Sequence, residues 1–296
     1  MSDEELKKVA NEVRKGIVTG VHAAKSGHPG GSLGAADIMT YLYFEEMNVD
    51  PADPRKADRD RFVLSKGHCA PGLYAVLAER GFFPKEDLET LRHIGSHLQG
   101  HPNMNDTPGV DMSTGSLGQG ISAAVGMAVA AKHWGDDYRT YALLGDGESE
   151  KGQVWEAAMF AGNQQLDNLC VIVDHNGLQI DGSNDEVMSL GDIQAKFKAF
   201  GYDVIDVADG NDMQQVLDAL GEEELTGMIL NLREPYCTPC RLVLLEQHTM
   251  AEAARLCGRP PKTVEAQVYR AKKMLAQQIL QNDRIPCERR SVHGTV

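Results

Sequence analysis

Two polar side chains in this 296-residue chain, Asp146 and Asn176, follow short apolar runs. The run YALL ends at Gly-Asp-Gly (145–147), and the run LCVIVD ends at His-Asn (175–176). Open α/β sheets bind ligands at the carboxyl ends of their strands, so neighbouring strands would bring both side chains together. A carboxylate and an amide oxygen suit Mg²⁺ or Ca²⁺ better than zinc.

The glycines beside Asp146 leave room for a phosphate, and the helix predicted to follow offers its positive N-terminal end. We therefore predict a clamp for a metal ion bound to a diphosphate. The alternative is simple turn chemistry, because Gly-Asp-Gly is common in turns.

A second glycine-rich segment, TGSLGQG (114–120), precedes a run of small residues typical of a closely packed helix. Its free backbone N–H groups could hold a phosphate or a ring. The glycine spacing fits neither a dinucleotide fingerprint nor a P-loop, so both of those site types are excluded.

Three histidines lie in glycine- or proline-bearing loops: His28 in GHPG, His68 in KGHC and His101 in GHPN. Loops carried by a rigid scaffold often hold catalytic groups, and imidazole can move protons near pH 7. The alternative is that they are ordinary surface residues. We assign that alternative to His22, His93 and His133.

The elements that must position these residues alternate between strands and helices, which predicts βαβ units and a mostly parallel, doubly wound α/β sheet. A loop is predicted at 25–34. The predicted strands are 62–65, 140–144, 169–174, 202–207 and, more weakly patterned, 225–232. The predicted helices are 4–24, 35–47, 72–80, 121–134, 152–164, 212–220, 241–247, 250–257 and 262–280.

Composition excludes several classes. No apolar run approaches the roughly 20 residues that span a membrane, and the charged N-terminus does not resemble a signal peptide. Six cysteines form no disulfide framework, which favours a reducing cytoplasm. The net charge of −14 is uneven: residues 233–296 hold 11 Lys/Arg and 6 Asp/Glu, whereas residues 1–232 carry −19. This change of sign indicates two parts with different partners.

Residues 1 to about 220 closely resemble transketolase, specifically its amino-terminal, diphosphate-binding half. The motifs that carry the resemblance are SGHPGGSLGAADIMTYLYF, LSKGHCAPGLYAVL, GHPN, TGSLGQG, GDGESEKGQVWEAAMFA and LDNLCVIVDHNGLQIDG. The GDG motif with its downstream asparagine is the general thiamine-diphosphate signature. The histidines of SGHPG and GHP favour transketolase over deoxyxylulose-phosphate synthase.

The resemblance implies a thiamine-diphosphate-binding fold with thiamine diphosphate and Mg²⁺ as cofactors. It implies that Asp146, Asn176 and the carbonyl of Leu178 hold the metal. It also implies the following roles: Gly147, Asn176 and His68 contact the diphosphate, Gly115, Ser116 and Leu117 line the thiamine site, and His28 and His101 face the sugar phosphate and relay protons.

The chain also departs from the family pattern. The pyrimidine-binding domain that supplies the activating glutamate has no counterpart, so a carboxyl-terminal transketolase subunit is expected as partner, and the assembly is expected to be a hetero-oligomer or a homodimer. Lys151 stands where an acidic residue is usual. The tail from about 221 resembles region four of extracytoplasmic-function RNA polymerase sigma factors, with basic residues Lys262, Arg270, Lys272 and Lys273.

We therefore expect a transketolase-like domain (1–220), a helical helix-turn-helix-like tail (221–280) and disordered residues 281–296. The expected function is transfer of a two-carbon ketol unit between sugar phosphates in the pentose phosphate pathway. The alternative is a sigma-factor-like DNA-binding protein with a non-catalytic transketolase-like domain, in which the tail contacts DNA. The pair Cys237 and Cys240 is interpreted as two free thiols.

Overall fold

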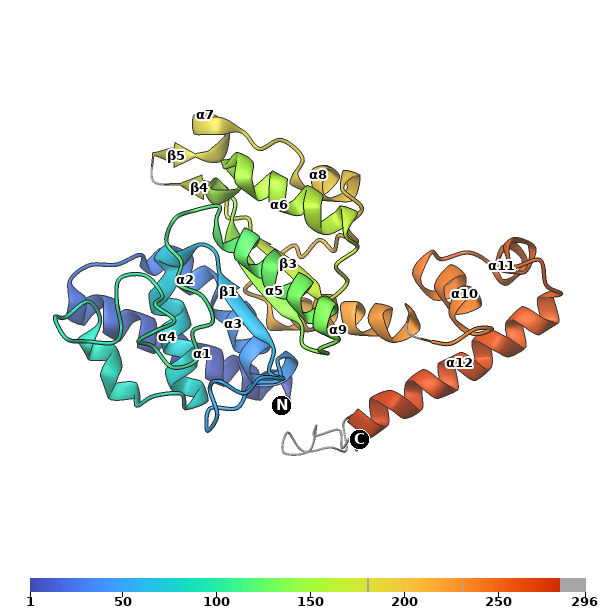
Figure 1. The fold of residues 1–296 in the computed structure, drawn as a ribbon, viewed down its shortest axis with the longest axis horizontal. Helices are drawn as coiled ribbons and strands as arrows, with labels where there is room; N and C mark the ends of the chain where they lie inside the picture. Colours follow the sequence, from blue (N-terminus) through green and yellow to red (C-terminus); the bar gives the residue numbers. More distant parts are fainter. Residues whose placement is uncertain (180, 231, 283–296) are drawn as a thin grey trace. The chain divides into compact units, whose positions relative to one another are not determined.

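The computed structural model describes residues 1–179, 181–230 and 232–282. The chain divides into two compact units, Met1–Leu217 and Asp218–Val296. Figure 1 shows the fold with the helices and strands labelled. The predicted disordered segment lies outside the described residues from position 283 onward.

The centre of the first unit is a three-stranded sheet in the order β1-β2-β3. The strands are β1 (Arg61–Leu64), β2 (Thr140–Gly145) and β3 (Leu169–Asp174). Both pairs are parallel, with Leu64 opposite Leu143 and Gly145 opposite Asp174. This confirms the predicted strands at 62–65, 140–144 and 169–174, and the carboxyl ends of β2 and β3 meet at one edge.

The remaining elements of the first unit are helices and one short hairpin, and α9 (Met213–Leu230) continues into the second unit. A short hairpin joins β4 (Leu178–Gln179) to β5 (Gly182–Ser183). Short 3₁₀ helices occur at Gly67–Cys69, Lys85–Thr90 and Gly147–Glu150. The α-helices are α1 (Asp3–Ala24), α2 (Pro29–Gly34), α3 (Ala36–Tyr41), α4 (Ala70–Arg80), α5 (Gly120–Trp134), α6 (Gly152–Asn163), α7 (Asn184–Met188), α8 (Ile193–Ala199) and α9 (Met213–Leu230).

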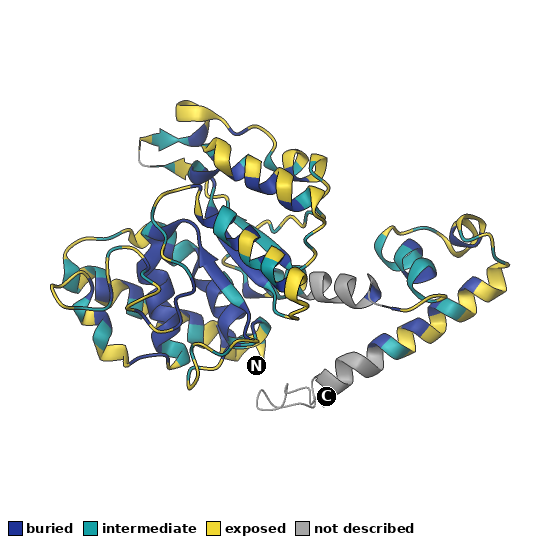
Figure 2. Cartoon of the chain, in the orientation of Figure 1, coloured by how far each residue is buried: buried dark blue, intermediate teal, exposed yellow. Residues whose placement is uncertain are grey.

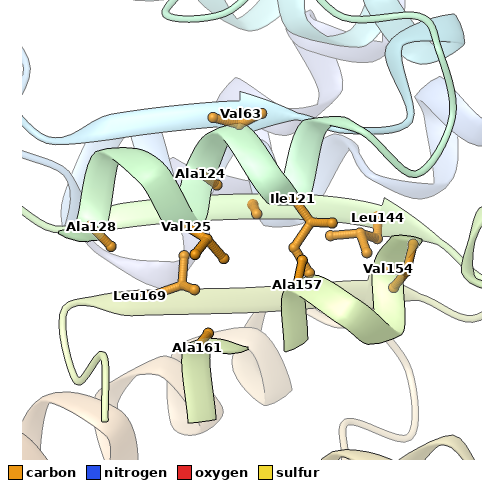
Figure 3. Packing of buried hydrophobic residues seen from close by; sticks show 11 residues of the cluster. Val63, Ile121, Ala124, Val125, Ala128, Leu144, Val154, Ala157, Ala161 and Leu169 are labelled. Carbon is orange, nitrogen blue, oxygen red and sulfur yellow. The ribbon is translucent and has the colours of Figure 1, made fainter. Parts of the chain in front are cut away.

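One face of the sheet is covered by α5 and α6. Figure 3 shows that small side chains of these helices interdigitate with branched side chains of the strands. Alanine allows the helix backbones to approach the sheet closely, and burial of this cluster removes apolar surface from water. The buried cluster comprises Val63, Ile121, Ala124, Val125, Ala128, Ala142, Leu144, Val154, Ala157, Ala161 and Leu169.

The opposite face of the sheet is covered by the π-helical turn Leu42–Glu46, which continues α3. Successive strand residues point to opposite faces, and Phe62, next to Val63, contacts Tyr43 with ring centroids 5.6 Å apart. Tyr141, next to Ala142, donates a hydrogen bond to Glu46 at 2.8 Å. Elements on both faces confirm the doubly wound α/β class.

Three predicted elements are wrong. Residues 202–207 contain no strand, because Tyr202 packs on Phe197 at 5.2 Å and Ile205 stays 41% exposed. Residues 225–230 continue α9, since their leucine and methionine favour a helix over a strand. The predicted loop at 25–34 contains α2, which starts with Pro29 in its first turn, where proline is tolerated.

The second unit is helical. Thr249 begins α11 (Met250–Leu256) with a capping box to Glu252, and a turn leads into α12 (Pro261–Asn282). Before them come α10 (Cys237–Cys240) and a π-helical turn, Arg241–Leu245. Figure 2 shows buried and exposed residues alternating along α12. Its buried residues Val264, Val268, Ala271 and Leu275 join a core with Leu242, Ala253 and Ala254.

Within the described residues, no helix is long and apolar enough to cross a membrane. The five cysteines that the structure describes are in the thiol form, outside any disulfide: Cys69, Cys170, Cys237, Cys240 and Cys257.

Candidate active site

Asp146 lies at the edge where β2 and β3 end, and its side chain is buried there at 2% exposure. Its backbone N–H donates to the carbonyl of Asp174 at 3.2 Å, which continues the ladder one residue beyond the strands. One carboxylate oxygen accepts from the N–H of Gly147 at 2.8 Å and the other from Gly177 at 2.6 Å. These bonds fix the carboxylate in an orientation that uses only part of its acceptor capacity.

The loop after β3 brings the other two predicted metal ligands to the same place. The amide oxygen of Asn176 accepts from the N–H of Leu178 at 2.9 Å, and Gly177 connects this loop to Asp146. The Leu178 side chain is 65% exposed, so the turn is open to solvent. A carboxylate, an amide oxygen and a backbone carbonyl form a hard-oxygen donor set, which fits Mg²⁺ bound to a diphosphate.

A buried carboxylate that the sequence reasoning missed holds this turn in place. Glu148 is 3% exposed and accepts from the Ser65 hydroxyl at 2.6 Å. It also accepts from the N–H of Gly118 at 2.8 Å and of Gly145 at 3.1 Å. Glu148 thereby connects β1, β2 and the TGSLGQG segment. In the sequence, its position directly after Gly-Asp-Gly could have indicated that Glu148 belongs to the site.

The TGSLGQG segment lies against the GHP loop and the end of β1. Gly115 has a φ of +137°, and a Cβ there would lie 2.9 Å from the Cδ2 atom of His101. A Cβ on Gly67 would lie 2.6 Å from the backbone nitrogen of Gly115. Only glycine allows this approach of backbone to backbone. The backbone carbonyl of Ser116 accepts a hydrogen bond from the Gln119 N–H at 3.2 Å. Ser116 is exposed and Leu117 is 37% exposed, so both lie on the open side of the segment.

The three predicted histidines converge although they are far apart in the sequence. The rings of His28 and His68 are edge to face, with centroids 5.2 Å apart. Burial, the Lys66 ammonium and the two neighbouring histidines lower the pKa of His68 to about 4. Burial and the positive charge of Arg92 also lower the pKa of His101. His68 is therefore neutral at pH 7 and can accept or donate a hydrogen bond.

A hollow of ≈ 460 Å³ opens beside His101. Its lining includes Arg92, Ser96 and Gln99, which offer hydrogen-bond donors to a polar ligand. The Arg92 guanidinium donates to the Ser26 hydroxyl at 3.0 Å. The structure therefore places the predicted site residues at the sheet edge and on the loops around it.

The family described as "Transketolase, thiamine diphosphate binding domain" matches residues 5–227. The chain is 47% identical over 218 residues to an apulose-4-phosphate transketolase subunit of Phocaeicola vulgatus, across 73% of this chain and 76% of that protein. It is 45% identical to a 6-deoxy-6-sulfo-D-fructose transketolase subunit of a Clostridium species, across 74% of this chain and 80% of that protein.

The solved transketolase from Leishmania mexicana superposes with a TM-score of 0.72 at 38% identity. The alignment covers 74% of this chain but 34% of that one, so this chain corresponds to about a third of a full transketolase.

The fold and the site define a thiamine-diphosphate-binding domain. The chain belongs to the transketolase family, and its residues 5–227 match the thiamine diphosphate binding domain of that family. The predicted transketolase resemblance is confirmed over residues 5–227, and the sigma-factor resemblance of the tail is supported by none of these matches.

Proposed function

We propose that this chain is one subunit of a two-chain transketolase that transfers a two-carbon ketol unit between sugar phosphates. The observation that carries the proposal is the convergence of the Asp146 turn, the TGSLGQG segment and three histidines at one sheet edge. Relatives named as transketolase subunits support the division into two chains.

For the cofactor site, Asp146, the Asn176 side chain and the Leu178 carbonyl would hold Mg²⁺. The backbone of Gly147, with Asn176 and His68, would contact the diphosphate, and Gly115, Ser116 and Leu117 would line the thiamine. When bound, thiamine diphosphate supplies the carbanion chemistry of carbon–carbon bond cleavage. The hard-oxygen donor set and the glycines that keep the turn open support this assignment.

His28 and His101 would bind and orient the sugar oxygens. Because burial lowers the pKa of His101, this ring is available as a neutral proton acceptor at pH 7. The hollow beside it, with the Arg92 guanidinium, suits an anionic sugar phosphate. Exclusion of water from the glycine-lined edge would strengthen each of these hydrogen bonds.

The partner would be a carboxyl-terminal transketolase subunit that carries the pyrimidine-binding domain and its activating glutamate. The family match covers residues 5–227 with the thiamine diphosphate binding domain, and relatives named as transketolase subunits support a second chain. We propose a reducing cytoplasmic location and a place in pentose phosphate metabolism. Six cysteines scattered over 296 residues, without the spacing of a disulfide framework, support the location.

For domain organisation, we propose a catalytic unit up to about residue 220 and a separate helical tail. All residues of the proposed site belong to the first of these. The exposed basic residues on α12 are compatible with weak contact to DNA, but the transketolase motifs explain far more of the chain than a DNA-binding function does.

The test is complementation by the partner. We expect no ketol transfer from the purified chain alone with thiamine diphosphate and Mg²⁺, because in the proposed arrangement the partner supplies the activating carboxylate. Addition of a carboxyl-terminal transketolase subunit should restore turnover, measured by a coupled assay with a ketose phosphate donor. Full activity of the chain alone would refute the two-chain arrangement.

Cofactor binding gives a second prediction. In Asp146→Ala, the one carboxylate of the proposed metal site is lost, so Mg²⁺-dependent binding of thiamine diphosphate should weaken by at least about 100-fold. Isothermal calorimetry with and without Mg²⁺ measures this change. Asp136→Ala, outside the site, is the control. Unchanged Mg²⁺-dependent affinity in Asp146→Ala would overturn the metal assignment.

A further inference from the structure

Lys66 is a charged residue in an unusual place. It follows β1 at the same sheet edge as Asp146, and it is 2% exposed. Lysine is almost never fully buried without a partner, because an uncompensated ammonium in the interior costs several kcal/mol. A role for this side chain must therefore be sought in what surrounds it.

The Lys66 ammonium joins two segments that the sequence separates widely. It forms an ion pair with the carboxylate of Asp174 at the end of β3. It also donates to the carbonyl of Gly31 in α2 at 3.1 Å. Its aliphatic stem crosses β2, since a Cβ on Gly145 would lie 3.7 Å from the Lys66 Cδ atom. One side chain thus connects β1, β3 and α2.

His28 and His68, whose rings are in contact, lie on the α2 segment and on the segment of Lys66 itself. His28 immediately precedes α2, and His68 follows Lys66 by two residues. The fit around α2 is tight, because a Cβ on Gly31 would lie 2.7 Å from the Cys69 sulfur and 3.9 Å from the His68 Nε2 atom. A small shift of α2 would therefore change how His28 meets His68.

We infer that Lys66 is a positioning residue, whose ammonium holds α2 against the end of β3 so that His28 and His68 face each other across the site. The importance of this pair for sugar chemistry rests on the proposed function, whereas the positioning itself does not. Without the ammonium, the Gly31 carbonyl and the Asp174 carboxylate lose their shared partner, and the long hydrogen bond from the Ser32 hydroxyl to the Cys69 carbonyl, at 3.4 Å, is left to hold α2.

The pKa of His68 provides a measurable test of whether the Lys66 ammonium lies beside this ring. Lys66, Asp174, His28 and His101 are the charged or titratable groups that act on this ring. Lys66 lowers the pKa of His68, and Asp174 raises it by a smaller effect. Removal of the Lys66 charge should therefore raise the pKa of His68 from about 4 toward the ordinary value of 6.5.

The experiment compares the full chain with Lys66→Met, which keeps the length of the stem and removes the charge. Histidine-selective NMR follows the pH titration of His68 and the nuclear Overhauser contact between the His28 and His68 rings. In Lys66→Met the contact should disappear, and the pKa of His68 should rise by about one unit. Lys85→Met, which removes an exposed partner of Glu79, should change neither.

Lys66→Met leaves the carboxylate of Asp174 without its ion-pair partner, and a second variant is needed in case this loss prevents folding. Lys66→Met/Asp174→Asn leaves no unpaired buried charge, and it should fold but still lack the ring contact. A wild-type chain without the contact, or either Lys66 variant with the wild-type contact and titration, would overturn the inference. Calorimetry of thiamine diphosphate on the same wild-type sample tests the proposed function separately, because its failure leaves the NMR result intact.

Discussion

At the scale of single residues, the site depends on groups whose ionisation is set by burial. His68 is the clearest case, because burial and the Lys66 ammonium lower its pKa to about 4. In the unfolded chain the same group titrates near 6.5. Between these values the unfolded state binds more protons than the folded state, so acid favours unfolding.

The pH dependence of stability should reflect this difference. As pH falls from about 6.5 to about 4, His68 should contribute a progressive loss of unfolding free energy. In His68→Gln this contribution disappears, and the slope of stability against pH becomes shallower. Urea denaturation of both chains at pH 7, 6 and 5 measures it. Identical slopes would mean that His68 is not held neutral by its surroundings.

The sequence predicts which residues form the site better than it predicts their burial, contacts and protonation. Asp146 and Asn176 could be placed together because parallel neighbouring strands end at one edge. The roles of Glu148 and Lys66 could not be derived in this way. Glu148 contacts Gly118, and Lys66 contacts Gly31, and each pair is at least 30 residues apart in the sequence. Spacing along the chain does not encode such contacts.

At the scale of elements, close approach of backbones fixes where the helices lie. The tightest case is Gly162 on α6, where a Cβ would lie 2.0 Å from the carbonyl oxygen of Phe200 at the end of α8. By contrast, Gly126 on α5 faces open space, with no atom within 4 Å of a Cβ. The two helices cover the same face of the sheet but tolerate side chains very differently.

These glycines form a matched pair for mutation. Gly162→Ala should destabilise the chain by about 2 kcal/mol, because the backbone of α8 must move to admit the methyl group. Gly126→Ala should stabilise it by about 0.5–1 kcal/mol, because alanine is the better helix former at an exposed position. Urea denaturation of each variant measures both values. A neutral Gly162→Ala would show that α8 is not held against α6.

The elements that were predicted wrongly show why periodicity fails at some places. Alternating apolar residues at 202–207 suggested a strand, but Tyr202 packs on Phe197 and against the core cluster of the sheet, and the segment forms no strand. Glycine content suggested a loop at 25–34, but the buried Ser32 and its hydrogen bond to the His28 carbonyl at 2.9 Å stabilise α2. In both places tertiary contacts outweigh local preference.

At the scale of the whole molecule, the two units differ in net charge and in the kind of secondary structure that forms their hydrophobic cores. The first unit is built around a parallel sheet, and the second unit has a helical core to which α10, α11 and α12 contribute. Residues 233–296 hold 11 Lys/Arg and 6 Asp/Glu, against a net charge of −14 for the chain. The inner face of α12 packs in that core, and its outer face exposes the basic side chains.

This charge distribution gives the last prediction. Lys262, Arg270, Lys272 and Lys273 are exposed on α12, so contact with duplex DNA would be made mainly to phosphates and would weaken steeply with salt. The acidic remainder of the chain opposes such contact at long range. We therefore expect the whole chain to give at most weak binding at roughly 20 mM salt, and none at physiological ionic strength.

A gel-shift titration of the whole chain against duplex DNA, at low and at physiological salt, tests this prediction. A variant with Lys272 and Lys273 changed to Gln should weaken any low-salt shift, because it removes two of the four exposed basic charges on α12. Tight, sequence-specific binding that persists at physiological salt would show that the tail reads base edges as well as phosphates. In that case α12 would have a function of its own, separate from the transketolase site.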